Sequence, residues 1–466
     1  MKHSLLLSCF LFTVTLSSIS QDSSSLLKKY KFRTPGFRAL QLNINAAGNL
    51  YDAKRVNGTD VNGSDINSNI AVNYFKIAST NKRQHLSTIS INPVFNFSKN
   101  KNAVSINRSR NARLDIEWSR TDRFFNKQNL FFEIGNELAI NGYSQKHTSA
   151  FNDNRRKYSV FSDKLIVGIG KGRLENVQDA QMAMFIINDL RRLGLLAEEP
   201  DAATQYQLAE LITDINNRRV FDNRARLIYE LTRIDSFLQN KLLITIPNIA
   251  YFTTVNDNWA LAFNPGRVNG TRIYAQLKPG LNLNFQGFNQ NDTSAFSYKG
   301  DTKQFIYFYE PEIGMEFQKP VSLHWQRTAN ASLRFTRRFV RTNSKTESSS
   351  VVTENEDFTT SSELVFNSFY GFGFYPNNRT VVNGGVNFEA VYGTMDMGIS
   401  RHDYFVLGPG LQLNSSYFLN YRTRIFLTAG LNYRYAELKD DPPVTFVYDK
   451  NLVTGNFNIG FTHFVF

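Results

Sequence analysis

Cysteine is almost absent from this chain of 466 residues, which contains Cys9 alone. Cys9 lies in a segment that we expect to be removed, so the remaining chain has no disulfide scaffold, no cysteine-held metal and no thiol nucleophile. Beyond the N-terminus no run of about 18 apolar residues occurs, so the sequence predicts no transmembrane helix. None of the six histidines pairs at metal-ligand spacing, so we expect no metal site.

Aromatic residues are abundant, with 40 Phe and 21 Tyr in a chain whose mean hydropathy is only -0.34. Many aromatics in a polar chain are typical of strands that turn one face to an oily phase and the other to water. The formal net charge is +13, and the lysines and arginines are scattered along the chain. This scatter favours a basic pore lining or a basic rim near anionic lipid head groups over a nucleic-acid partner.

The N-terminus has the pattern of a secretory signal peptide. A positive start at Met1 to His3 is followed by a mostly apolar run from Ser4 to Leu16. Small residues then stand at signal-peptidase spacing up to Ser20. We therefore expect residues 1–20 to be cleaved off near Ser20 and Gln21. The run is too short for a membrane anchor, and a polar segment follows it.

From about Arg38 onward, segments of ten or more residues alternate apolar and polar side chains. In one such segment Ala112, Leu114, Ile116 and Trp118 alternate with Arg113, Asp115, Glu117 and Ser119. A tilted membrane strand needs about 9–11 residues, whereas a soluble strand averages about five or six. The pattern predicts barrel strands over 21–170 and again over 242–466.

The connections between the C-terminal segments alternate in length. Tight turns are expected at Lys319-Pro320, at 376–378 and at 420–422, and long polar loops near 287–302, 340–357 and 437–452. Every tight turn falls on the same side as the C-terminus. Short periplasmic turns and long external loops are typical of outer-membrane barrels, whereas a soluble sandwich has no reason to show this asymmetry.

The periodicity becomes helical between the two strand regions. We expect a near-neutral insert of three amphipathic helices over 171–241, which either lies in the periplasm or plugs the lumen. The strand count is then 16, or 14 if the segments near 242–254 and 258–266 do not span. The predicted fold is mostly β, a transmembrane antiparallel barrel of 14–16 strands with a three-helix insert in the middle of the chain.

A glycine-rich stretch precedes the insert, with Gly168, Gly170 and Gly172 at alternate positions. A phosphate-binding loop would need a closing Gly-Lys-Ser/Thr, which is missing. We interpret the three glycines as a hinge that lets a strand leave the barrel wall and become a helix, since glycine tolerates unusual backbone angles.

The chain ends with aromatic residues on one strand face, Phe464 and Phe466. This end resembles the terminal signal that the barrel-assembly machinery recognises, although Gly460 stands one place earlier than the usual glycine. The composition, rich in Asn, Lys and Phe, together with a helical insert in a barrel, resembles uncharacterised outer-membrane proteins of Bacteroidota. The resemblance implies a cell outer-membrane location, contact with outer-membrane lipid and assembly by that machinery, and it implies no activity.

Two functions compete. The first is a channel or transporter whose helices plug or gate the pore. Its selectivity would be set by cations on the polar strand faces, for which the candidates are Arg113, Arg272, Lys278, Arg334 and Arg424. The second is a structural or assembly component of a cell-surface machine that docks a periplasmic protein through the insert. We expect no enzyme, no catalytic residues and no cofactor, because no Gly-x-Ser-x-Gly motif or oriented Ser–His–acid set is evident.

Overall fold

The structure is a computed structural model of the whole chain. It does not describe the residues 1–23, 55–59, 102–105, 150–151, 218–222, 242, 245–246, 261–266, 293–296, 349–350, 397–400, 421–422, 439–450 and 464–466. The expected signal peptide and the terminal Phe464 and Phe466 therefore lie outside the described residues. Among the residues that are described, no helix is both long and apolar enough to cross a membrane.

In the described part of the chain, fourteen antiparallel strands form one sheet in which every strand pairs with its neighbours in sequence. Six strands precede the helices: β1 (Thr34–Lys54), β2 (Asp60–Ser79), β3 (Arg83–Lys101), β4 (Ile106–Phe125), β5 (Leu130–Thr148) and β6 (Asn152–Asn176). Eight follow them: β7 (Val268–Asp292), β8 (Ser297–Pro320), β9 (Trp325–Ser348), β10 (Val351–Asn377), β11 (Thr380–Asp396), β12 (Arg401–Asn420), β13 (Thr423–Leu438) and β14 (Asn451–His463). The predicted mostly-β antiparallel class is confirmed, with the lower of the two strand counts.

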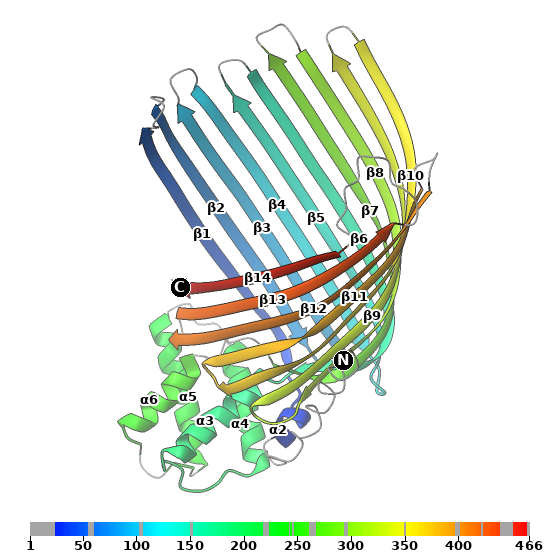
Figure 1. The fold of residues 1–466 in the computed structure, drawn as a ribbon. Helices are drawn as coiled ribbons and strands as arrows, with labels where there is room; N and C mark the ends of the chain where they lie inside the picture. Colours follow the sequence, from blue (N-terminus) through cyan, green and yellow to red (C-terminus); the bar gives the residue numbers. More distant parts are fainter. Residues whose placement is uncertain are drawn as a thin grey trace, which may run out of the picture.

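The sheet is strongly curled, and in Figure 1 the last strands cross in front of the first ones. Pairing links β6 to β7 across the helical insert, with Asn176 opposite Val268, so the insert does not interrupt the sheet. The pairings of the described residues run from β1 to β14 and include none between β14 and β1.

The two faces of the sheet differ in chemistry because successive side chains of a strand point to opposite sides. On one face, which we call the outer face, large apolar side chains are exposed, as at Leu114, Ile273 and Ile313. On the other, which we call the inner face, charged side chains such as Glu133 and Glu310 are buried. Ion pairs on the inner face reach across an intervening strand, as between Lys164 of β6 and Glu310 of β8. Side chains from strands two apart meet more easily on the concave side of a curled sheet, so we assign the inner face to the concave side.

Every direct strand-to-strand connection at one end of the sheet is short, and these connections include the three tight turns that the sequence predicts. They join β2 to β3, β4 to β5, β8 to β9, β10 to β11 and β12 to β13. The end of β14 lies at this end too, since His463 pairs with Thr423. We call it the turn end.

Two of the three predicted long loops are instead extensions of strands. β7 continues to Asp292 and β8 begins at Ser297, while β9 and β10 leave only a short gap between Ser348 and Val351. Polar residues pair well there, because cross-strand ion pairs such as Lys345 with Glu354, at 2.6 Å, favour antiparallel pairing. The third, near 437–452, lies mostly outside the described residues.

The described residues include five helices, which lie at the turn end, below the strands in Figure 1. They are α2 (Ser24–Lys29), before β1, and α3 (Gln178–Arg192), α4 (Ala202–Asn217), α5 (Asn223–Asn240) and α6 (Ile249–Ala260), between β6 and β7. Their main buried cluster includes Leu27, Ile186, Leu208 and Ile234. We call the five helices the helical cap.

The insert differs from the expected one in its limits and in its number of helices. β6 continues to Asn176, and the segment near 242–254, one of the two segments whose spanning the sequence leaves open, contributes to the fourth helix, α6. Tyr251, Val255 and Trp259 are buried at helical spacing, and Asn248 Oδ1 accepts a hydrogen bond from the Tyr251 amide at 2.9 Å. Burial of this stripe against the other helices, with an asparagine at the N-cap, favours a helix over a strand.

Candidate functional site

The inner face carries a wall of paired charges along β4–β10. Its pairs are Arg123–Glu133 at 2.5 Å, Lys164–Glu310 at 3.5 Å, Arg272–Glu316 at 2.7 Å, Lys278–Glu312 at 2.6 Å and Arg338–Glu363 at 3.1 Å. Each acid is largely withdrawn from solvent, and tyrosines also contact this wall. Tyr274 donates to Glu312 at 2.9 Å, and Tyr404 donates to Glu363 at 2.6 Å. The wall is therefore charged but nearly compensated.

Gly168 and Gly170 have a different role from the predicted hinge. Both lie inside β6 and pair with β5 and β7, well before the first helix of the insert. The Gln276 side chain crosses Gly168 to donate to Glu133 at 2.8 Å, and a Cβ on Gly168 would come within 2.7 Å of Gln276 Cγ. The ring of Phe131 lies over Gly170 in the same way. These glycines therefore leave room for inner-face side chains.

Gly172 is the one of the three glycines with an unusual backbone, with φ of 98°. It still pairs with Arg272, and the strand continues to Asn176 before α3 begins at Gln178. The strand-to-helix junction thus lies at Val177, whose fully buried side chain belongs to the core of the cap. The hinge interpretation is wrong for all three glycines, because Gly168 and Gly170 pair with both neighbouring strands and Gly172 still pairs with β7.

All five cations predicted to line a pore lie on the inner face, since each has an exposed apolar neighbour pointing the other way. Those neighbours are Leu114, Ile273, Leu277, Leu333 and Ile425. Arg272 and Lys278 belong to the wall of paired charges described above. Arg334 lies directly opposite Glu312 in the β8–β9 register, beside Lys278. The structure thus brings Arg272, Lys278 and Arg334 into one region.

Arg113 and Arg424 lie apart from that region. Arg113 pairs with Asp115 of its own strand, with Nε 2.9 Å from Oδ1. Arg424, near the turn end of β13, places its guanidinium over the rings of Phe418 and Phe426, at 6.0 and 5.5 Å. Because most of the predicted cations have a carboxylate partner, the wall holds less net positive charge than the sequence suggested.

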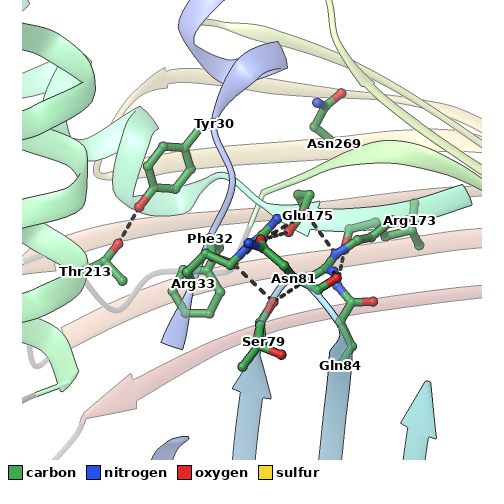
Figure 2. Close-up of polar contacts among 12 residues, drawn as sticks. Tyr30, Phe32, Arg33, Ser79, Asn81, Gln84, Arg173, Glu175, Thr213 and Asn269 are labelled. Atoms are coloured by element: carbon green, nitrogen blue, oxygen red, sulfur yellow. Dashed lines mark hydrogen bonds and ion pairs between the residues drawn. The ribbon is translucent and has the colours of Figure 1, made fainter. Parts of the chain in front are cut away.

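The turn end is closed on one side by a network around the start of β1, drawn in Figure 2. Arg33 Nη1 donates to both carboxylate oxygens of Glu175 at 3.0 Å, and Arg173 Nε lies 2.9 Å from the same group. Arg173 also donates to the Asn81 carbonyl at 3.1 Å and to Ser79 Oγ at 2.9 Å. The network thus joins the segment before β1, the β2–β3 turn and the end of β6.

The same N-terminal segment is tied to the helices through Tyr30, as Figure 2 also shows. The Tyr30 hydroxyl contacts Thr213 Oγ1 of α4, which donates to Asp179 Oδ2 of α3 at 2.5 Å. Asn216 donates to the other carboxylate oxygen at 3.3 Å. Burial raises the pKa of Asp179 to about 6 and also raises the pKa of Tyr30, which therefore stays protonated. The chain thus fastens the first strand to the cap before the sheet begins.

A buried arginine fastens the other side of the cap. Arg267, which directly precedes β7, is fully buried and donates to the carbonyls of Ser322 and Leu323 at 2.7 and 2.6 Å and to Gln326 Oε1 at 2.8 Å. Its guanidinium also lies 4.9 Å from the centre of the Tyr375 ring. Burial lowers the pKa of Arg267 to about 10, so the group remains charged at neutral pH.

The helices also touch the turns of the later strands. The Phe185 ring of α3 lies 5.9 Å from the His324 ring in the β8–β9 turn. Asn378, in the β10–β11 turn, donates to Asn258 of α6, and Arg379 forms an ion pair with Asp257. Leu323, Tyr375 and Val381 belong to the same buried cluster as the helices. The cap is therefore fixed across the turn end by buried contacts.

Sequence reasoning missed the groups that fix the cap. Nothing in the local pattern around Arg267 distinguishes it from the many exposed arginines, because its burial depends on a turn about 55 residues later in the chain. The Leu26, Leu27 and Tyr30 triplet does offer a helical apolar spacing that could have marked a docked segment.

Comparison with known proteins gives little beyond a general likeness. No protein-family model matches the chain, and no curated protein matches it. Among solved structures the chain is similar to the β domain of the Bordetella autotransporter BrkA, with 9% identity, a TM-score of 0.28, and coverage of 92% of this chain and 99% of that one. It is also similar to the Pseudomonas putida toluene transporter TodX, with 8% identity, a TM-score of 0.31, and coverage of 88% and 86%.

A third similar structure is a loop-deletion mutant of OmpT, an outer membrane protein of Vibrio cholerae. The identity is 8%, the TM-score is 0.27, and the match covers 92% of this chain and 99% of that one. Likenesses at TM-scores this low do not assign a function.

Proposed function

We propose that this chain is a transport barrel of the bacterial outer membrane whose turn-end mouth is closed by the helical cap. In the membrane the sheet closes on itself, because a free strand edge in hydrocarbon would leave backbone groups without hydrogen bonds. The exported chain is folded by the barrel-assembly machinery through its C-terminal strand. The single observation that carries the proposal is the division of the sheet into an exposed apolar face and a charged inner face.

The outer face has the dimensions of a membrane belt on β3 and β4. The apolar row runs from Ile89 to Phe97 on β3 and from Trp118 to Ala112 on β4, where Arg110 then lies opposite Phe97. The nine residues of β3 from Ile89 to Phe97 match the roughly 9–11 residues that a tilted membrane strand needs. Charged residues follow at both ends of this band. The sheet thus meets the length requirement of a membrane crossing.

The inner face has the composition expected of a water-filled passage. Its buried acids and bases would be costly in a dry core unless paired, and here they are paired and contacted by tyrosine and glutamine side chains. Alternating charges on a pore wall allow solute to pass while limiting the preference for either sign. A small or extended polar solute suits such a wall better than a hydrophobic one.

The cap is proposed as the element that limits passage. It is fixed by Tyr30 on one side and by Arg267 on the other, and its core is shared with the turns of β8–β11. These contacts favour a closed resting mouth that opens only when part of the cap moves.

Removing the four helices of the cap that lie between β6 and β7 tests this proposal. Since Asn176 lies directly opposite Val268, residues 177–267 can be replaced by Asn-Gly, which joins antiparallel strands in a two-residue turn. We expect low single-channel conductance for the full chain in a planar bilayer and a several-fold larger, steady conductance for the deletion variant. Heat-modifiable migration on a gel would show that both variants contain a folded barrel.

Absence of conductance from both folded variants would overturn the transport proposal. Replacing Arg192, an exposed residue of α3 whose ion pair with Asp189 is 3.4 Å long, provides a control in which the cap stays in place. Its conductance should equal that of the unaltered chain.

One observation favours a second candidate, docking of a periplasmic protein through the cap. Apolar side chains are exposed on α5 and α6, at Leu227, Ile228, Ile249 and Phe252, the third of them 82% exposed. If docking is the function, I249D with F252D should abolish recovery of a chemically cross-linked partner from periplasm without changing conductance. Unchanged cross-linking by the double variant would eliminate this candidate.

A further inference from the structure

A charged cluster interrupts the outer face near the β2–β3 and β4–β5 turns. His85 of β3 lies directly opposite Asp122 of β4, and Arg83 lies opposite Phe124. Directly opposed residues of an antiparallel pair share a face. Phe124 in turn faces Phe132 of β5, and both rings are exposed. The cluster therefore lies on the outer face and not on the inner wall.

Asp122 organises the cluster. Its side chain is only 2% exposed, yet it is surrounded by cations. Arg83 donates to Oδ1 through Nε at 2.8 Å and through Nη2 at 2.6 Å, and His85 Nδ1 lies 2.8 Å from the same oxygen. Arg120 donates to Oδ2 through Nε at 2.8 Å. One buried carboxylate thus fixes the orientation of two guanidinium groups.

Both guanidinium groups remain accessible. The side chains of Arg83 and Arg120 are 44% and 50% exposed. Asp122 takes two N–H groups of Arg83 and one of Arg120, so it leaves other guanidinium N–H groups of both arginines available. Two arginines against one aspartate also leave an excess positive charge. Oriented guanidinium donors with excess charge are suited to a phosphate oxygen.

More cations lie in the same row of the outer face. Lys76 of β2 is opposite Ser87, which is opposite Arg120, and Arg38 of β1 is opposite Lys76. The row directly above, toward the middle of the strands, holds Ile89 and Trp118. The cluster therefore lies at the boundary where the apolar band ends and lipid head groups would begin.

The charged head of Arg83 lies against an aromatic ring at this boundary. Its guanidinium carbon lies 5.7 Å from the centre of the exposed Phe124 ring, which is a cation–π distance. An acyl chain lying along the apolar rows would place its head group beside Arg83 and Arg120.

We propose that Arg83 and Arg120, held by Asp122, bind the phosphate of a phospholipid head group in the leaflet on the turn side of the membrane. This inference rests on the membrane location proposed above. The ligand class is an anionic glycerophospholipid, whose phosphate accepts the guanidinium hydrogen bonds and whose chains cover the adjacent apolar rows. Inorganic phosphate accepts the same guanidinium hydrogen bonds but has no acyl chains to cover the apolar rows.

The chain contains a matched control for the key residue. Arg113 lies in the same strand as Arg120, and its Nε likewise donates to the aspartate two residues later, at 2.9 Å. Arg113 points to the inner face, however, where lipid cannot reach. R120Q and R113Q thus remove the same kind of local ion pair from opposite faces of one strand.

Native mass spectrometry of the full chain in neutral detergent measures the retained lipid. The probes are dioleoylphosphatidylglycerol, dioleoylglycerol as the same chains without phosphate, and inorganic phosphate. We expect the unaltered protein and R113Q to retain phosphatidylglycerol equally. R120Q and R83Q should bind it roughly tenfold more weakly, the factor that corresponds to one lost charge-assisted hydrogen bond. Dioleoylglycerol should bind weakly to all four.

Three results would overturn the lipid site. R113Q could weaken retention as much as R120Q, dioleoylglycerol could bind as well as the phospholipid, or inorganic phosphate could displace the lipid at equal concentration, which would indicate a site for the free anion. If R120Q does not fold by the heat-modifiability test, R120K takes its place in the comparison. R120K keeps the positive charge but removes the planar guanidinium group.

Alkaline carbonate extraction of membranes separates this inference from the proposed function. Release of the protein by carbonate would overturn the proposal that the chain spans the membrane, whatever lipid it retains in detergent. If the protein stays in the membrane and R120Q and R83Q bind lipid unchanged, the lipid site is overturned and the membrane proposal stands.

Discussion

Arg267 donates a hydrogen bond to Gln326 across 2.8 Å, and both side chains are buried where the cap meets the β8–β9 turn. The contact joins the residue that directly precedes β7 to the second residue of β9, beside the β8–β9 turn. Because Arg267 also binds two turn carbonyls, a single side chain fixes both the cap and the turn.

Replacing Arg267 should therefore loosen the cap. R267A leaves several buried acceptors without donors, and we expect the free energy of unfolding to fall by about 2–4 kcal/mol. Thermal unfolding in detergent, followed by Trp325 emission, measures this change. R192A provides the exposed comparison and should change stability by less than about 0.5 kcal/mol. Equal effects of the two substitutions would contradict the role given to Arg267.

The strands could be predicted from sequence because their signal is local. Alternation along 112–119 is visible in any one segment, and it needs only the two-residue period of a strand. The inner-face placement of Arg272 and Lys278 follows from the same period. Their ion pairs with Glu316 and Glu312 do not, since these depend on the register between β7 and β8.

The parts that sequence reasoning missed depend on tertiary packing. The segment near 249–260 contains β-prone aromatic residues, and only the helices around it make burial of Tyr251 and Trp259 possible. Gly168 and Gly170 looked like a hinge because their neighbours across the sheet, Gln276 and Phe131, are far away in the chain. Glycine in a strand often marks a close approach, which is the reading that the structure supports.

The stability of the cap should depend on pH through Asp179. Its pKa in the folded protein is raised to about 6 from the usual 3.8, because burial disfavours the charged form. The folded state then binds the proton more tightly, so the cap is most stable below pH 4 and loses up to about 3 kcal/mol as the pH rises through 6. D179N, which keeps one acceptor for Thr213, should be more stable at neutral pH and lose this dependence.

Urea unfolding followed by Trp259 emission at pH 4.5 and pH 7 measures the effect. Trp259 is buried in the cap and donates to Glu230 at 2.7 Å, so its emission reports on the cap. Trp118 and Trp325 are replaced by Phe in both proteins. Identical pH profiles for D179N and for the protein that retains Asp179 would show that another group controls the dependence.

Docking of the N-terminal segment should depend on Leu27. Its side chain is fully buried in the core that α2 shares with α3 and α4. L27A leaves a cavity and should weaken docking by about 2–4 kcal/mol. Hydrogen exchange measures the result as faster exchange of the amide protons over 24–33, whereas K29A, at an exposed position beside it, should leave exchange unchanged. Faster exchange in K29A alone would contradict the docking.

The ion pair between Arg272 and Glu316 gives the most direct test that the inner face conducts. E316Q leaves Arg272 without its carboxylate, and R272Q leaves the carboxylate without its cation, so the two substitutions should shift ion selectivity in opposite directions. The reversal potential across a salt gradient measures this shift, and the cap-deleted variant supplies an open pore. R337Q removes a charge from the outer face, where Arg337 donates to Ser362, and should leave the potential unchanged. Shifts of the same sign in E316Q and R272Q would mean that current does not pass along the wall of paired charges.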